Sequence, residues 1–199
     1  MTRTRIAALS LLLLLAAAPA SAQDWSLVVG ARGGATVPLH GQVSDARSWG
    51  GAGGVSVAGW HPSGFSPRLD LAYRALGDAP NDGVYHVTGL FHASVGLRWY
   101  APGWGRVAPF VGANVGLVAA FTGGGTSEAT PPDARRTGAR TVAMAVGGAL
   151  GLDVAVRRWL SFEVEARYDY VPPEEDGFYF PQLPGGGLLG VSAGANFRF

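Results

Sequence analysis

Residues Leu160–Tyr170 read LSFEVEARYDY, and their alternation decides the fold. The even positions all carry apolar side chains: Leu160, Phe162, Val164, Ala166, Tyr168 and Tyr170. The odd positions all carry polar ones: Ser161, Glu163, Glu165, Arg167 and Asp169. Because successive side chains of a β-strand point to opposite faces, this period of two predicts a strand with one apolar and one polar face.

The same alternation recurs along the chain, most clearly in Gly89–Trp99 and Leu189–Phe199. It is least regular in 49–60, because Gly50–Gly54 contains four glycines and little side-chain pattern. Together these stretches predict eight strands, with expected spans 25–37, 49–60, 67–76, 85–100, 107–121, 141–156, 159–171 and 188–199.

Short and long connections alternate between these strands. The short ones are 61–66, 101–106 and 157–158, and the generally longer, polar ones are 38–48, 77–84, 122–140 and 172–187. This order is typical of an up-and-down outer-membrane barrel, which has short turns on one side and longer loops on the other. Tilted strands of about 9–11 residues cross a bilayer, and closure leaves no unpaired backbone edge in hydrocarbon. We therefore predict an all-β fold, an eight-stranded antiparallel up-and-down transmembrane β-barrel.

The first 22 residues are typical of a secretory signal peptide. Arg3 and Arg5 precede an apolar run of 13 residues at 6–18, and residues 19–22 (PASA) offer a small-residue cleavage site. That run is shorter than the about 20 residues of a membrane-spanning helix. We expect residues 1–22 to be removed, which leaves a barrel domain at 23–199. The alternative is a soluble secreted barrel whose apolar face points inward.

Composition excludes several classes of function. Glycine accounts for 31 of 199 residues, well above the usual share of about 7%. Because glycine has a low helix propensity, this content disfavours a helical fold. The absence of cysteine excludes disulfides, cysteine–zinc sites and thiol nucleophiles. Without residues 1–22, the chain has 13 arginines and 14 acidic residues, so we expect no basic surface that could bind nucleic acid. No metal or cofactor is predicted, because the four histidines lack metal-ligand spacing: His40, His61, His86 and His92.

Aromatic residues gather near the expected strand ends, as in the two interfacial girdles of outer-membrane barrels. The first girdle would contain Trp25, Trp60, Trp99, Trp104 and Trp159. The second would contain Tyr73, Phe121, Tyr168 and Tyr170.

Two glycine-spaced stretches and the last residue resemble a known family. Residues 109–116 (PFVGANVG) resemble the fifth strand of small outer-membrane barrels of the outer-membrane protein A and opacity-protein type. Residues 147–153 (GGALGLD), followed by Leu160–Tyr170, resemble the hairpin of strands six and seven in that family. Phe199, with Phe197 two positions earlier, resembles the terminal signal that the outer-membrane insertion machinery recognises.

This resemblance covers essentially the whole mature chain. It implies a monomeric eight-stranded barrel in the outer membrane of a Gram-negative cell. Outer-membrane protein A itself continues into a peptidoglycan-binding domain. The present sequence stops at strand eight, so we do not expect cell-wall tethering.

In such a barrel the polar strand faces line the lumen. Twelve charged or titratable residues share these inward positions: Arg32, Arg68, Asp70, Arg74, His92, Arg98, Asp153, Glu163, Glu165, Arg167, Asp169 and Arg198. The interior of an eight-stranded barrel is just wide enough for side chains to fill. Because buried charges need partners, we expect a plug of ion pairs and water. Inward glycines would make room for it: Gly112, Gly116, Gly190 and Gly194.

Two other uses of the lumen stay open. The plug could gate a narrow channel for ions or small solutes. Alternatively, His92 and Ser94 have the spacing of the His-x-Ser pair of lipid A deacylases, which are also eight-stranded outer-membrane barrels and also use a glutamate. No asparagine follows Ser94 and no glutamate follows at short range, which favours two ordinary lumen-facing polar residues.

Charged residues in two long connections point to surface contacts. They are Asp133, Arg135, Arg136 and Arg140 in one, and Glu174, Glu175 and Asp176 in the other. They could pair across the barrel mouth, contact lipopolysaccharide phosphates or divalent ions, or simply be solvated. We predict a non-enzymatic integral outer-membrane protein with a structural and surface-interaction role. Its expected partners are outer-membrane lipids, lipopolysaccharide and, through the C-terminal strand, the barrel-assembly machinery.

Overall fold

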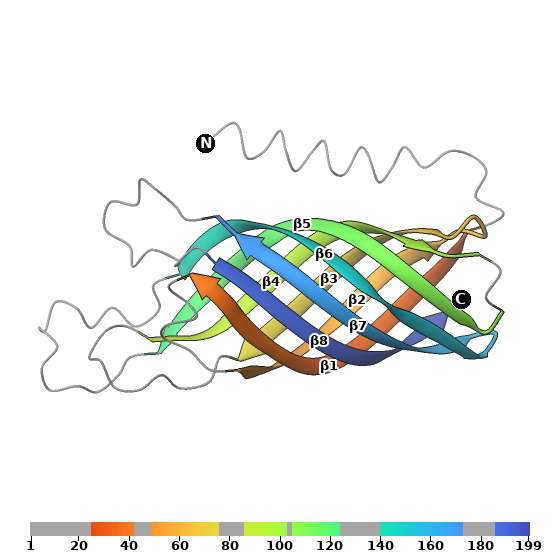
Figure 1. The fold of residues 1–199 in the computed structure, drawn as a ribbon. Coiled ribbons are helices and arrows are strands. Elements are labelled where there is room, and N and C mark those ends of the chain that lie inside the picture. Colours follow the sequence, from red (N-terminus) through yellow and green to blue (C-terminus); the bar gives the residue numbers. More distant parts are fainter. Residues whose placement is uncertain (1–24, 42–48, 76–85, 103–104, 124–139, 173–185) are drawn as a thin grey trace, which may run out of the picture.

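The computed structural model describes residues 25–41, 49–75, 86–102, 105–123, 140–172 and 186–199. Within them the chain forms eight strands: β1 (Ser26–Gly41), β2 (Gly50–Trp60), β3 (Phe65–Ala75), β4 (His86–Tyr100), β5 (Val107–Gly123), β6 (Arg140–Arg157), β7 (Leu160–Val171) and β8 (Gly186–Arg198). Figure 1 shows the strands tilted around a common axis. We name the end at which β2 turns into β3 and β6 turns into β7 the short-turn end, and the opposite end the long-connection end.

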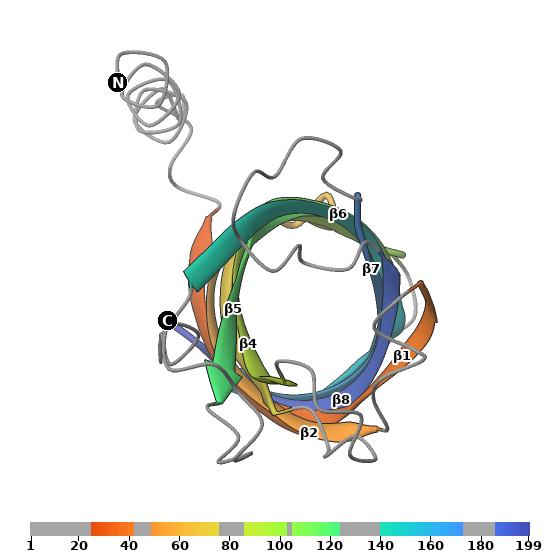
Figure 2. The same ribbon diagram turned by 90° about the vertical axis from the view of Figure 1, so that its left-hand side faces the viewer.

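Each strand pairs antiparallel with the next, and β8 returns to β1, so the sheet closes into a barrel (Figure 2). The closing seam runs from Val28 opposite Arg198 to Gly41 opposite Gly186. Backbone hydrogen bonds of 2.8 and 3.2 Å between Leu27 and Phe199 extend it at the short-turn end. Closure pairs the backbone groups that an open edge would expose, which is the condition for a sheet to cross hydrocarbon.

All eight predicted strands are present, and the differences lie at their ends. β1 continues to Gly41 instead of stopping at 37, and its last residues pair with the start of β8. β2 forms despite its glycines, because Gly50–Gly54 pair in register with residues 32–36 of β1. In the described part of the chain, no helix has the length and apolar character needed to span a membrane.

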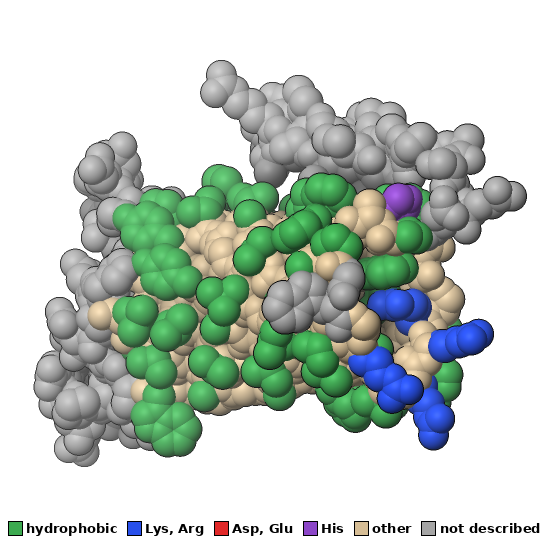
Figure 3. Space-filling view, turned by 45° about the vertical axis from the view of Figure 1, so that its right-hand side comes forward, with side chains coloured by type: hydrophobic (Ala, Val, Ile, Leu, Met, Phe, Trp, Pro, Cys, Tyr) green, Lys and Arg blue, Asp and Glu red, His purple; other side chains and the backbone are tan. Residues whose placement is uncertain are grey.

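The outward face of the barrel is apolar, and Figure 3 shows hydrophobic side chains spread over one side of the wall. Large apolar residues such as Leu27, Leu97 and Leu150 are about half exposed or more. The residues that alternate with them point inward and include most of the charged side chains of the described strands. This distribution is the reverse of a soluble barrel and matches a wall that faces lipid.

The aromatic girdles are present in part. At the short-turn end Trp25, Trp99 and Trp159 are exposed on the outside, and Tyr73 and Tyr170 are exposed on β3 and β7. Trp60 was expected in the same girdle, but its side chain lines the interior of the barrel. The reason is that the even-numbered positions of β2, which include Trp60, point inward. Trp104 and the side chain of Phe121 lie outside the described residues.

A glycine closes the tight turn between β2 and β3. The turn is held by hydrogen bonds from Gly64 N to His61 O (2.9 Å) and from His61 N to Phe65 O (3.0 Å). Gly64 adopts φ 90°, a conformation that other residues rarely reach, so glycine is required at this position.

Candidate functional site: the lumen

The twelve charged or titratable residues predicted to face inward all lie on the inward face of their strands. Ten of them are buried: Arg68, Asp70, Arg74, His92, Arg98, Asp153, Glu163, Glu165, Arg167 and Asp169. Arg32 and Arg198 are partly exposed. Alternation was sufficient to assign this face, because side-chain direction follows from position along a strand.

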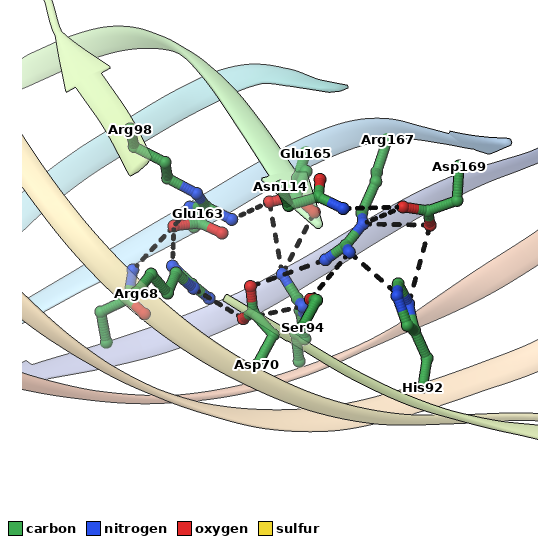
Figure 4. A network of polar contacts seen from close by, with 12 residues as sticks. Arg68, Asp70, His92, Ser94, Arg98, Asn114, Glu163, Glu165, Arg167 and Asp169 are labelled. Carbon is green, nitrogen blue, oxygen red and sulfur yellow. Dashed lines mark hydrogen bonds and ion pairs between the residues drawn. The ribbon is translucent and has the colours of Figure 1, made fainter. Parts of the chain in front are cut away.

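Glu163 on β7 lies at the centre of the first group of contacts (Figure 4). Its Oε2 accepts hydrogen bonds from Arg98 Nη1 at 2.7 Å and from Arg68 Nη1 at 3.3 Å. Asn196 Nδ2 on β8 donates a third, at 3.1 Å. The Arg98 guanidinium also lies over the ring of Phe110, 4.4 Å from its centroid. One carboxylate therefore joins strands β3, β4, β7 and β8.

Arg32 on β1 links the next two carboxylates. Its Nη2 lies 2.9 Å from Asp70 Oδ1, and its Nη1 lies 3.1 Å from Glu165 Oε1. Glu165 also pairs with Arg98, and Asp70 Oδ1 accepts a hydrogen bond of 2.7 Å from Arg68 Nε. These contacts connect both groups into one network.

Asp169 on β7 forms the part of the network nearest the long-connection end. It pairs with Arg74, and Arg167 Nε donates to both of its oxygens at 2.9 and 3.0 Å. Asn114 Nδ2 donates to Oδ1 at 3.1 Å. Arg167 Nη1 also reaches Asp70, at 3.5 Å, which joins Asp169 to the rest of the network.

Four carboxylates and five arginines thus form one continuous cluster across the lumen, which we name the ion network: Arg32, Arg68, Asp70, Arg74, Arg98, Glu163, Glu165, Arg167 and Asp169. Each carboxylate has at least two arginine partners. This pairing offsets the cost of removing the charges from water.

Inward glycines provide the space that these side chains occupy. A Cβ on Gly112 would lie 2.9 Å from Arg98 Cγ, and one on Gly194 would lie 2.8 Å from Arg32 Cβ. On Gly116 it would lie 2.6 Å from Ser94 Cβ. Gly190 differs, because the nearest atom would be 3.6 Å away, an ordinary contact. Three of the four glycines predicted to make room therefore do so.

His92 and Ser94 do not contact each other as a base and a nucleophile would. His92 Nδ1 lies 3.4 and 3.5 Å from Nη2 of Arg74 and of Arg167, and 3.8 Å from Asp169 Oδ2. Ser94 Oγ accepts a hydrogen bond of 2.9 Å from Arg167 Nη2. The histidine is directed to the ion network, and the hydroxyl is held by an arginine.

Two features of the lumen were missed by sequence reasoning. The first is a layer of buried apolar side chains on the long-connection side of the ion network, which we name the apolar layer: Leu90, Val118, Ala145, Val171 and Leu188. They come from five successive strands, β4 to β8, and are at most 4% exposed. The signal available in the sequence was Leu90, an apolar residue that interrupts the polar face of its strand.

The second is a cavity of about 320 Å³ at the short-turn end, which we name the vestibule. Its lining includes Trp60, Ser66, Tyr100, Asp153, Asn196 and Arg198. Trp60 was expected in the outer girdle. The alternation of β2, applied as far as Trp60, would have placed its side chain in this cavity instead.

The remaining candidate residues lie outside what the structure describes. This is true of Asp133, Arg135, Arg136, Glu174, Glu175, Asp176 and the side chain of Arg140. Among the residues that are described, no cluster of three or more histidine or acidic side chains could hold a metal ion.

Comparison with known proteins identifies the fold. Neither a protein-family model nor a curated protein sequence matches this chain. Among solved structures, Neisserial surface protein A matches with a TM-score of 0.62 at 16% identity, covering 88% of this chain and 96% of that one. The chain has the fold of the small eight-stranded outer-membrane β-barrels.

Two Pseudomonas aeruginosa proteins with this outer-membrane barrel fold are also similar. The outer-membrane protein OprG matches with a TM-score of 0.56 at 10% identity, covering 88% of this chain and 96% of that one. The N-terminal β-barrel domain of OprF matches with a TM-score of 0.55 at 14% identity, covering 87% and 97%. At these identities the similarity concerns the barrel fold, and function has to be argued from the lumen and the wall.

Proposed function

We propose that this chain is an integral outer-membrane protein with a structural and surface-interaction role and a lumen that does not conduct. The observation that supports this most directly is the arrangement of two barriers in series. An ion would first have to separate the paired charges of the ion network and then enter the apolar layer. Breaking a buried ion pair costs about 3–5 kcal/mol, and an unpaired charge in an apolar region costs more.

The alternative function is a narrow channel for ions or small solutes. The vestibule favours it, because it opens part of the lumen from the short-turn end. For conduction, the arginines and carboxylates of the ion network would have to exchange partners, and the apolar layer would have to move aside.

Recordings of the refolded protein in planar lipid bilayers distinguish these two functions. With a closed lumen, we expect no discrete current steps, while a general porin added to the same bilayer gives them. A channel would instead give steps whose size changes in Arg98→Gln or Glu165→Gln. Steps of that kind from the wild-type protein would overturn the proposal.

We further infer that residues 1–22 direct export and are removed, and that Phe197 and Phe199 are read by the barrel-assembly machinery. Their accessibility supports this role. Phe197 points outward and stacks on Trp159 with ring centroids 6.1 Å apart, and Phe199 is 76% exposed. Outer-membrane lipids would cover the apolar wall of a monomer, and lipopolysaccharide would meet the long connections. The proposal includes neither an enzymatic activity nor a cofactor.

A further inference from the structure

The vestibule contains a carboxylate with an environment unlike that of the other carboxylates in the lumen. Asp153 Oδ2 accepts hydrogen bonds from Ser161 Oγ at 2.8 Å and from Asn196 Nδ2 at 3.1 Å. Asp70, Glu163, Glu165 and Asp169 each pair with two or more arginines. Asp153 is buried, with 8% of its surface exposed, and yet no arginine of the described residues lies within ion-pair distance of it. It therefore presents to the cavity a carboxyl group that has no ion-pair partner in the described ranges.

An arginine that has no acidic group within ion-pair distance among the described residues faces the same cavity. The Arg198 guanidinium lies over the Trp60 ring, 4.2 Å from its centroid, and forms no ion pair within the described part of the chain. Stacking on an aromatic face leaves the edge of the guanidinium, with its N–H donors, free to bind an anion. Arg106, which also lines the vestibule, is exposed at its rim.

Arg68, which pairs with Asp70 and Glu163 of the ion network, also reaches the lining. The remainder of the lining is uncharged. Val28, Ala58, Ala108 and Ala155 contribute small apolar side chains, and Tyr100 contributes an aromatic ring. A volume of about 320 Å³ lies at the lower end of the range for small-molecule sites. The vestibule thus combines a buried acid, a basic rim and an apolar wall in a space suited to a small ligand.

We propose that the vestibule binds a small zwitterion, an amino acid or short peptide that carries both an ammonium and a carboxylate group. The ammonium group would bind Asp153, and the carboxylate would bind Arg198. A simple cation would be repelled by the arginines of the rim, and a simple anion would meet Asp153 and the nearby Glu163. A ligand with both charges satisfies the acid and the base together.

Binding of the dipeptide Ala-Ala to the refolded protein in dodecyl maltoside tests the site. The indole N–H signal of Trp60, assigned by its loss in Trp60→Phe, reports on occupancy of the cavity by NMR. We expect a saturable shift with Ala-Ala. N-acetyl-Ala-Ala, which lacks the ammonium group, and Ala-Ala amide, which lacks the carboxylate, should each bind at least about tenfold more weakly, since each loses a hydrogen bond to a charged group.

Two substitutions assign the charges. Asp153→Asn keeps an acceptor for Ser161 and Asn196 and should reduce the affinity for Ala-Ala to that of the acetylated peptide. Arg198→Gln should reduce it to that of the amide. Arg157→Gln is the matched control, because Arg157 is exposed at the short-turn end and does not line the vestibule. The shift in gel mobility on boiling verifies that each variant is folded.

Any of three results would overturn the proposal. The first is the absence of a saturable Trp60 shift with Ala-Ala. The second is equal binding of the three peptides, and the third is unchanged binding by a folded Asp153→Asn protein. These measurements do not depend on whether the lumen conducts, so they are independent of the bilayer recordings.

Discussion

At the scale of single residues, Asp169 illustrates how the lumen tolerates charge. The side chain has no exposed surface, and its oxygens are contacted by Arg74, Arg167 and Asn114. Alternation along β7 assigned Asp169 to the inward face, but it could not identify these partners. Arg74 lies 95 positions away in the sequence, and the two meet through the closure and stagger of the barrel. The face of a charged residue was therefore predictable, and its ion pairs were not.

Removing the charge of Asp169 should destabilise the barrel. Asp169→Asn leaves Arg74 buried without a carboxylate and leaves Arg167 with Asp70 alone, at 3.5 Å. We therefore expect the free energy of unfolding to fall by about 3–5 kcal/mol. Urea titration in lipid vesicles, followed by tryptophan fluorescence, measures this change. Arg157→Gln, at an exposed position, should alter stability by less than about 1 kcal/mol. An Asp169→Asn protein as stable as that control would contradict the role given to the ion network.

At the scale of the strands, glycine has two different environments. Gly147 and Gly148 are neighbours on β6, but they face opposite sides of the wall. A Cβ on Gly147 would lie 2.6 Å from the Tyr168 carbonyl oxygen, whereas one on Gly148 would have its nearest neighbour at 3.6 Å. The sequence alone predicted all eight strands but placed several ends short, as in β1. Its last residues lack alternation, and pairing with β8 holds them in the sheet.

These neighbouring glycines provide a matched pair of substitutions. Gly147→Ala should destabilise the barrel by about 1–3 kcal/mol, because the added methyl group overlaps the backbone of β7. Gly148→Ala should have little effect, since its methyl group would point away from the lumen and have its nearest neighbour at an ordinary contact distance of 3.6 Å. The same urea titration compares both variants with the wild type. Equal effects of the two substitutions would show that crowding in the lumen does not explain the inward glycines.

At the scale of the whole molecule, the polar interior and apolar exterior follow directly from the alternation that Leu160–Tyr170 displays. The order of the layers along the barrel axis did not follow from it. The apolar layer takes one residue from each of five strands, and Ala143 on β6 packs against it. Such a layer can be predicted only when the stagger between neighbouring strands is known, and that stagger is a property of the closed sheet.

A closed barrel predicts a simple behaviour on gels. Because its sheet has no edge at which unfolding can begin, the protein extracted from outer membranes should keep its fold in cold dodecyl sulfate. It should therefore migrate differently before and after boiling. Circular dichroism of the unboiled protein should show β-structure. Identical migration, together with solubility in the absence of detergent, would contradict a lipid-facing wall.

The position of the apolar layer also determines how the barrel would respond to an electrical potential across the membrane. The vestibule is open to water at one end, and the ion network beside it consists of polarisable groups. The apolar layer has neither property. Permittivity falls from about 80 in water to about 4 in a dry protein interior, and a potential difference concentrates where permittivity is lowest. Most of the field inside the lumen would therefore fall across Leu90, Leu188 and their neighbours, so that the arginines and carboxylates experience little of it.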